Sequence, residues 1–296
     1  MRQRWDFGRM VAANVNGRQS GANQEGRHAG HFDRLLQNNV SLRYSAAGKL
    51  CTNDAIRSCL MAINRLPAQY WNPVNVENVM PDVRKLRKIT WNIKRLDGSR
   101  EISHLYSVAI PAMWELAHKG KLTAERALAF LHHDSLENGY VPEEKLRSRL
   151  NGSFGIVARL SHRHGITLPE YAREYMDAVF DNGYSVVAKR HDSRANLSTL
   201  AYIIKPNAKL AERGLGKGII FHMHLVEEGM ATRKDREILH ALENTRPDSI
   251  ESLLELSYVV HRKGTVKGNG GQKQAMVFQM PTNPSHAQSL DAAEKK

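Results

Sequence analysis

The spacing of apolar residues predicts a series of helices in residues 31–182. Ile56, Leu60 and Ile63 fall on one face of a helix that Thr52 or Asn53 caps. Further helices are expected over Ala112–His118, Leu122–His132, Glu143–Leu150, Ser153–His164 and Thr167–Phe180. The last of these opens with a capping box. Residues 31–182 are therefore predicted to form an α-rich domain.

After Gly183 the pattern changes to short apolar runs rich in β-branched and aromatic residues, which are typical of strands. Five strands are expected: Tyr184–Ala188, Leu200–Ile204, Gly218–Val226, Ser257–His261 and Ala275–Met280. Two helices, Thr232–Glu243 and Ile250–Leu256, separate the third strand from the fourth. The predicted fold class is therefore α+β, with a mainly helical N-terminal part followed by a C-terminal part, residues 183–282, that contains a largely antiparallel sheet.

Three smaller segments complete the predicted organisation. Residues 1–30 are rich in Gly, Asn, Gln and Arg, which indicates a flexible basic arm. Residues 283–296 are expected to form a disordered tail. Residues 84–100 are strongly basic and include the Asp97-Gly98 turn, so a short basic hairpin is expected there, with Ile102–Val108 as its return strand.

The charge of the chain indicates its partner. The 296 residues include 43 Lys and Arg against 30 Asp and Glu, a formal net charge of +13 that attracts phosphate polymers. The cations concentrate in residues 84–100, 145–173, 189–217 and 262–273, whereas residues 227–255 are acidic. The sequence therefore predicts binding of DNA or RNA through basic patches. The residues expected to contact nucleic acid are Arg84, Lys85, Arg87, Lys88, Trp91, Lys94, Arg95, Arg159, Arg163, Lys189, Arg190, Arg194, Arg262, Lys263 and Lys267.

A helix-turn-helix is one form that this binding can take. The helices Glu143–Leu150 and Ser153–His164 flank Asn151-Gly152, and the second would present Arg159 and Arg163 to phosphates or base edges. Helix pairs joined by a glycine turn are also common in α-rich domains that bind no DNA, so both interpretations stay open.

A candidate metal site lies in the third expected strand. Alternation along a strand places His222 and His224 on the same face. This His-apolar-His pattern resembles the metal-binding motif of the HUH nucleases, the rolling-circle replication initiators and plasmid relaxases. The resemblance implies a divalent metal ion at the two histidines, which polarises a scissile phosphate, and a tyrosine that attacks it.

The nucleophile of such an enzyme has to come from elsewhere in the chain. Tyr171 and Tyr175 lie one helical turn apart, and Tyr258 is a further candidate. His191 or His240 would serve as a third metal ligand.

Three classes of function follow. The first is a nucleic-acid-binding protein of a phage, plasmid or other mobile element. The alternative is a metal-dependent enzyme that nicks single-stranded DNA, and the third is a structural or assembly protein that contacts packaged nucleic acid. Two free thiols, Cys51 and Cys59, and apolar runs too short to span a bilayer predict a cytoplasmic protein without a membrane partner. Catalytic activity and oligomeric state stay open.

Overall fold

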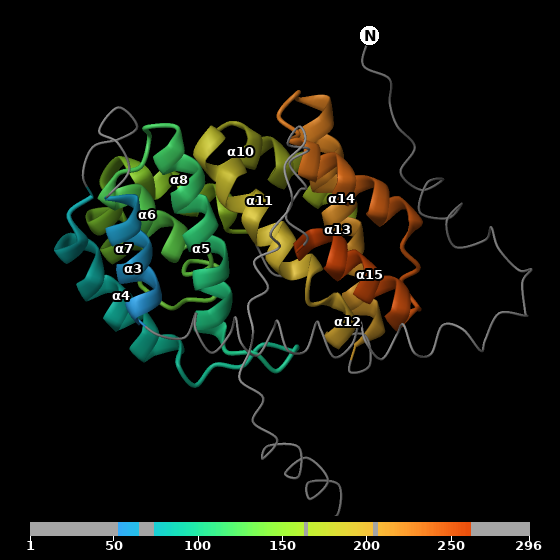
Figure 1. Cartoon of the computed structure of the whole chain (residues 1–296), viewed down its shortest axis with the longest axis horizontal. Helices are drawn as coiled ribbons and strands as arrows, with labels where there is room; N and C mark the ends of the chain where they lie inside the picture. The colour runs from blue at the N-terminus through green and yellow to red at the C-terminus, as the bar shows by residue number, and fades with distance from the viewer. Residues whose placement is uncertain (1–52, 65–73, 163–164, 204–206, 262–296) are drawn as a thin grey trace, which may run out of the picture. The chain divides into compact units, whose positions relative to one another are not determined.

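A computed structural model describes residues 53–64, 74–162, 165–203 and 207–261 of the chain, and every regular element in these ranges is a helix (Figure 1). The predicted α+β class is therefore wrong. Within the described ranges the only β pairing is an isolated bridge between Lys94 and Arg100.

The N-terminal helices largely follow the apolar spacing. They are α3 (Asn53–Ile63), α4 (Val76–Thr90), α5 (Glu101–His118), α6 (Ala124–Leu131), α7 (Glu143–Leu150) and α8 (Phe154–Leu160), with a single 3-10 turn, η2 (Asn151–Ser153), between the last two. Thr123 caps α6 by accepting a hydrogen bond from the backbone N–H of Arg126. The expected helix pair around Asn151-Gly152 is therefore present as α7 and α8.

The basic hairpin has a tight turn but no strands. Gly98 adopts a φ of +77°, and its backbone N–H donates to the Arg95 carbonyl. The segment before it, however, belongs to α4 as far as Thr90, and the expected return strand lies entirely within α5. The Asp97-Gly98 pair identified the turn because glycine readily adopts a positive φ. The short apolar runs on either side of the turn fit either a strand or a buried helix, so the sequence alone did not distinguish the two.

The segment from residue 168 to residue 180 is one helical stretch with an unusual centre. It consists of α9 (Leu168–Glu170), a π-helical turn η3 (Tyr171–Tyr175) and α10 (Met176–Phe180). The capping box is confirmed, because Thr167 and Glu170 each accept a hydrogen bond from the other's backbone N–H.

Four of the five expected strands are parts of helices. The C-terminal helices are α11 (Gly183–Leu197), α12 (Leu200–Ile203), α13 (Ala208–Glu227), α14 (Arg233–Asn244) and α15 (Ile250–His261). The fifth expected strand, Ala275–Met280, lies outside the described residues. α14 and the first half of α15 confirm the two helices predicted there, and Thr232 caps α14 with Asp235.

Close helix packing explains the glycines of α13. A Cβ atom at Gly214, Gly216 or Gly218 would lie 2.7 to 2.8 Å from the side chains of Leu200, Leu168 and Leu197 respectively. The glycines therefore let neighbouring segments approach α13 closely, rather than forming a loop. This role is invisible in a single sequence, where Gly usually indicates a turn.

The apolar residues of the described helices form two clusters. The larger joins α3 to α11 and includes Phe221 of α13, and the smaller joins α12 to α15 with Leu197 of α11. The larger core crosses residue 183, where the second domain was expected to begin. α11 contacts α5, α8, α13 and α15, and it lies between the earlier and later helices in Figure 1. Within the described ranges, no helix is both long enough and apolar enough to cross a bilayer.

Candidate metal centre

Two histidines and an aspartate meet beside α11. His104 comes from the first turns of α5, and His133 and Asp134 follow the end of α6 directly. The two histidine Nε2 atoms lie 3.3 Å apart. One carboxylate oxygen of Asp134 is 3.4 Å from the Nε2 of His104, and the other is 3.4 Å from the Nε2 of His133. These three side chains form a group able to hold a metal ion.

Asp192 of α11 lies beside this group and would add a fourth ligand. Its Oδ1 lies 3.3 Å from the Nε2 of His104 and 4.0 Å from the Nε2 of His133. The cluster therefore presents two imidazole nitrogens and two carboxylates from three separate segments of the chain. Mixed nitrogen and oxygen ligands of this kind suit Mn²⁺, Fe²⁺, Co²⁺, Ni²⁺ and Zn²⁺.

The separations fit a common coordination sphere. Ligands about 2.1 Å from an ion that takes six ligands lie about 3.0 Å apart at right angles and about 4.2 Å apart when opposite. The separations above, 3.3 to 4.0 Å, fall within this range. Four protein ligands would leave two positions of such an ion open to water and substrate.

Hydrogen bonds around the cluster orient its ligands. The Nδ1 of His133 lies 3.0 Å from the carbonyl oxygen of Phe130. Because a carbonyl only accepts, Nδ1 must carry the proton, and a neutral His133 then presents its Nε2 lone pair to the cluster. This outer hydrogen bond is the one that metal-binding histidines usually make.

Asp192 is held by two donors from its own helix. Lys189 Nζ donates to Oδ2 at 2.7 Å, and Asn196 Nδ2 donates to Oδ1 at 2.7 Å. Arg95 in turn donates to Asn196 Oδ1 at 2.8 Å and to Glu101 at 3.1 Å. The loop after α4 is thereby tied to the helix that carries the carboxylate.

The electrostatics of the cluster favour a positive charge at its centre. Burial raises the pKa of both carboxyl groups, but His133 beside Asp134 and Lys189 beside Asp192 outweigh it, so both pKa values lie below the usual range. Burial likewise lowers the pKa of His133, yet the charges of Asp134 and Asp192 raise it to about 9. A proton or a metal cation satisfies this demand equally well on charge alone, and the hydrogen bond from the His133 Nδ1 is compatible with either.

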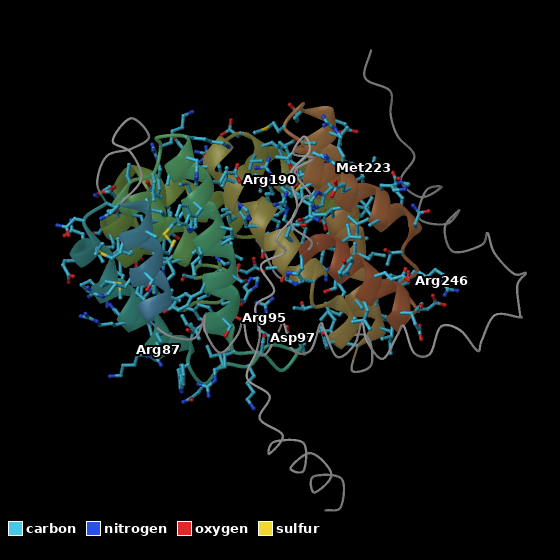
Figure 2. All side chains as sticks on the ribbon, in the orientation of Figure 1. Arg87, Arg95, Asp97, Arg190, Met223 and Arg246 are labelled. Carbon is cyan, nitrogen blue, oxygen red and sulfur yellow. The ribbon has the colours of Figure 1, made fainter. Side chains whose placement is uncertain are left out.

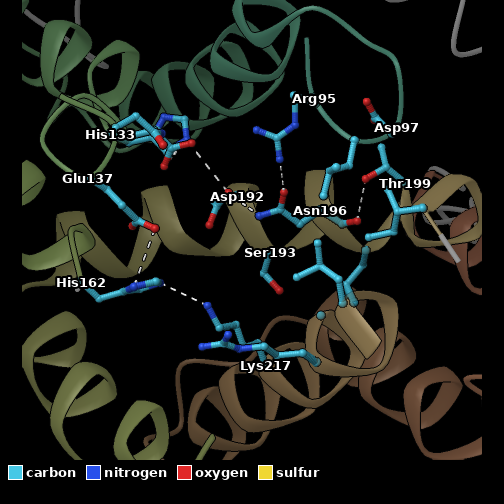
Figure 3. A pocket seen from close by; sticks show the side chains of 18 of the residues that line it. Arg95, Asp97, His133, Glu137, His162, Asp192, Ser193, Asn196, Thr199 and Lys217 are labelled. Carbon is cyan, nitrogen blue, oxygen red and sulfur yellow. Dashed lines mark hydrogen bonds and ion pairs between the residues drawn. The ribbon is translucent and has the colours of Figure 1, made fainter. Parts of the chain in front are cut away.

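The cluster borders a cleft of about 530 Å³. Figure 3 shows His133, Glu137, His162, Asp192 and Lys217 around it. The remaining walls combine further cations with an aliphatic shelf: Lys94, Arg95, Arg213, Leu197, Leu200 and Ile203. A cleft with a metal site, cations and an apolar shelf suits an organic phosphate.

Two of the three candidate tyrosines also line this cleft. Tyr171 and Tyr175 are buried with ring centroids 4.9 Å apart, and the hydroxyl of Tyr175 donates to the Leu160 carbonyl at 2.7 Å. Burial raises the pKa of both hydroxyls, which disfavours the phenolate that an attacking tyrosine requires. Tyr258 is half-exposed on α15 and is not among the residues that line the cleft.

His222 and His224 do not share a face. They lie on α13, where residues two apart point about 200° away from each other. His222 is fully buried beside Asp235, whereas His224 is partly exposed and its Nδ1 lies 3.0 Å from the carbonyl of Ile220. The strand that carried the resemblance to the HUH nucleases is thus a helix. His191 and His240 lie apart from them, His191 against Glu115 and His240 exposed near Glu243.

Many of the basic residues that were predicted to contact nucleic acid form ion pairs with acidic side chains. The paired cations are Arg95 with Glu101, Arg159 with Asp181, Lys189 with Asp192, Arg190 with Glu115 and Asp235, and Arg194 with Asp235. Arg190 lies among the central helices in Figure 2, whereas Arg87 lies near the edge of the view. Arg163, Arg262, Lys263 and Lys267 lie outside the described residues.

A different group of predicted contacts remains exposed on α4 and just beyond it. Arg84, Lys85, Lys88 and Lys94 are exposed and form no ion pair among the residues that the structure describes. Next to them the guanidinium groups of Arg87 and Arg100 stack on the Trp91 ring, 4.4 and 3.7 Å from its centroid. This basic face of α4 is the part of the predicted patches that the fold leaves available.

The cluster of His104, His133, Asp134 and Asp192 was missed by sequence reasoning. A His-Asp pair directly after a helix, together with Lys189, Asp192 and Asn196 at helical spacing, was the available signal. Reading Tyr184–Ala188 as a strand hid that spacing, because the segment begins α11.

No family model, curated protein or solved structure matches this chain. A function can therefore be inferred only from the geometry of the site.

Proposed function

We propose that this protein is a metal-dependent hydrolase of a phosphate ester, with the ion held by His104, His133, Asp134 and Asp192. The observation that carries the proposal is the convergence of two Nε2 atoms and two carboxylates at separations of 3.3 to 4.0 Å, with His133, Asp134 and Asp192 lining an open cleft. A bound ion supplies Lewis acidity to a phosphoryl oxygen and to a water molecule.

Other residues of the chain would position the ligands and bind the substrate. Lys189 and Asn196 hold Asp192 in place, and the cations of the cleft attract the phosphate. Leu197, Leu200 and Ile203 provide an apolar surface for the organic part of the substrate. A cleft of this volume can hold a nucleotide-sized ligand. Lys94 is one of the cations that line it.

The test is phosphate release from the full chain, first stripped of metal with a chelator and then supplied with Mn²⁺. 4-Nitrophenyl phosphate and bis(4-nitrophenyl) phosphate probe monoester and diester hydrolysis. Activity should appear on adding Mn²⁺ and should fall more than about 100-fold in Asp192→Asn. Asp248→Asn, an exposed aspartate between α14 and α15, is the matched control and should keep full activity. No stimulation by Mn²⁺, Zn²⁺ or Ni²⁺ with either ester would refute the proposal.

Nucleic-acid binding is a second proposal, favoured by the basic face of α4. Exposed Arg84, Lys85 and Lys88 lie on the helix that leads into the loop 93–97, and this loop lines the cleft. A phosphate polymer that follows α4 would thus reach the metal centre. Origin in a mobile element, a cytoplasmic location and a role in assembly stay predictions that rest on the sequence.

A further inference from the structure

A second polar chain lines the same cleft and has no part in holding the ion. Lys217 Nζ of α13 lies 3.2 Å from the Nε2 of His162, and the Nδ1 of His162 lies 3.7 Å from a carboxylate oxygen of Glu137 (Figure 3). The three residues come from the turn after α6, the segment after α8, and α13.

The donors and acceptors in this chain of groups determine which nitrogen of His162 carries the proton. The ammonium group of Lys217 can only donate, so the Nε2 of His162 accepts and its Nδ1 carries the proton that faces Glu137. A carboxylate thus orients an imidazole, which in turn orients the group at the cleft. The same logic positions the acting residue in hydrolytic triads.

Lys217 lies close to the metal centre. The ring centroid of Tyr171 is 4.9 Å from the Nζ of Lys217 and 5.8 Å from the Nζ of Lys189, which is itself bonded to Asp192. Lys217 and a lysine that contacts the cluster thus lie against the same aromatic ring. A phosphate bound at the ion would place its ester oxygen in the cleft that Lys217 also lines.

We propose that Lys217 is the general acid that protonates the leaving oxygen, with His162 and Glu137 as positioning residues. This role rests on the proposed hydrolase function. A water molecule forms the new P–O bond and releases a proton, and the P–O bond to the leaving group breaks. The leaving oxygen takes a proton from Lys217 Nζ. The proton lost by the water restores the ammonium group through solvent in the open cleft, so the reaction balances as ester plus water giving alcohol plus phosphate.

The surroundings of Lys217 support this role. Burial lowers the pKa of Lys217, and the charges of Lys189 and Arg213 add to this, giving a value of about 8. An ammonium group with a pKa near neutrality is a far better proton donor than an ordinary lysine. The titratable and charged groups that face it are His162, Glu137, Tyr171, Lys189, Asp192 and Arg213.

The experiment compares two esters in Mn²⁺-loaded full-length protein. 4-Nitrophenyl phosphate has a leaving group that departs without protonation, whereas phenyl phosphate has one that benefits from an acid. Lys217→Gln should lose about 100-fold or more in kcat on phenyl phosphate and much less on 4-nitrophenyl phosphate. Lys217→Arg keeps the charge but does not release a proton near neutrality, so its KM should stay near that of the unsubstituted protein while kcat on phenyl phosphate falls.

Controls separate this role from others. Lys209→Gln, an exposed lysine on the same helix, should change neither ester. His162→Gln should shift the basic limb of the pH–kcat profile on phenyl phosphate. Equal losses on both esters, or full activity of Lys217→Arg, would overturn the role of Lys217 while leaving the hydrolase intact. Absence of metal-stimulated hydrolysis in the unsubstituted protein would overturn both.

Discussion

The Nε2 atoms of His104 and His133 lie 3.3 Å apart in a buried site although 29 residues separate them in sequence. Two lone pairs cannot face each other at this distance without repulsion, so a proton or a metal ion has to lie between them. Asp134 and Asp192, each within 3.4 Å of the His104 Nε2, add negative charge on the same centre. The fold therefore concentrates charged and polar side chains in a largely buried position beside the cleft, at a cost in desolvation that a cation held there would offset.

Ion binding should stabilise the folded protein measurably. An ion that binds only the folded state, at 100 times its Kd, adds about 2.7 kcal/mol to the unfolding free energy. Adding Mn²⁺ or Zn²⁺ to chelator-treated protein should thus raise Tm, and His104→Ala should abolish the increase. His240→Ala removes an exposed histidine instead, and its Tm should still rise with the ion. A Tm that responds equally in both variants would place ion binding elsewhere.

His222 should make the protein less stable in mild acid. It is fully buried beside Asp235, whose carboxylate already binds Arg190 and Arg194. Burial lowers the pKa of His222 from 6.5 to about 4. The unfolded chain therefore takes up a proton before the folded chain does, and the unfolding free energy falls as the pH drops from about 6.5 towards about 4. The contribution is present in full above that window and amounts to about 3 kcal/mol at most.

Replacing His222 isolates this contribution. His222→Leu removes the titrating group from this buried position, so the slope of unfolding free energy against pH between 4 and 6.5 should become shallower. Urea unfolding at a series of pH values measures that slope, and His240→Leu provides the exposed control. An unchanged slope in His222→Leu would mean that the pKa of His222 is not lower in the folded protein than in the unfolded chain.

The basic face of α4 should give nucleic-acid binding a steep salt dependence. Charge removal in the triple variant Arg84→Gln, Lys85→Gln, Lys88→Gln should weaken binding of a single-stranded oligonucleotide. The slope of log K against log salt should decrease by up to about 2, since each lost phosphate contact contributes about 0.7. The double variant Arg147→Gln, Arg233→Gln removes exposed cations that already pair with Glu143 and Glu237, and its slope should stay close to the original. Equal slopes in all three proteins would exclude α4 as the binding face.

The sequence allowed local structure to be predicted better than the arrangement of the chain. The capping box at Thr167 is found where it was predicted, and Thr123 and Thr232 cap helices in the same way, because a cap depends on residues only two or three positions away. The apolar run around Val186 is ambiguous, since a buried helix and a buried strand are equally apolar. Its helical state depends on Asn182, whose side chain caps α11, and on packing against α5.

The site was harder to predict for a related reason. His222 and His224 attract attention because they are close in sequence, yet the helix separates their side chains. His104, His133 and Asp192 are far apart in sequence and meet only through the packing of α5 and α11 and the turn after α6. Tyr171 and Tyr175 lie side by side, as their spacing predicts, and they line the cleft, although their hydroxyls are buried.

The most direct measurement of the metal centre is anomalous X-ray diffraction from crystals of the full chain soaked with Mn²⁺ or Zn²⁺. We expect one strong anomalous peak about 2.0–2.2 Å from the Nε2 atoms of His104 and His133 and from carboxylate oxygens of Asp134 and Asp192. A cluster that stays free of the ion, with the two histidines hydrogen-bonded to each other and the anomalous signal elsewhere, would contradict it.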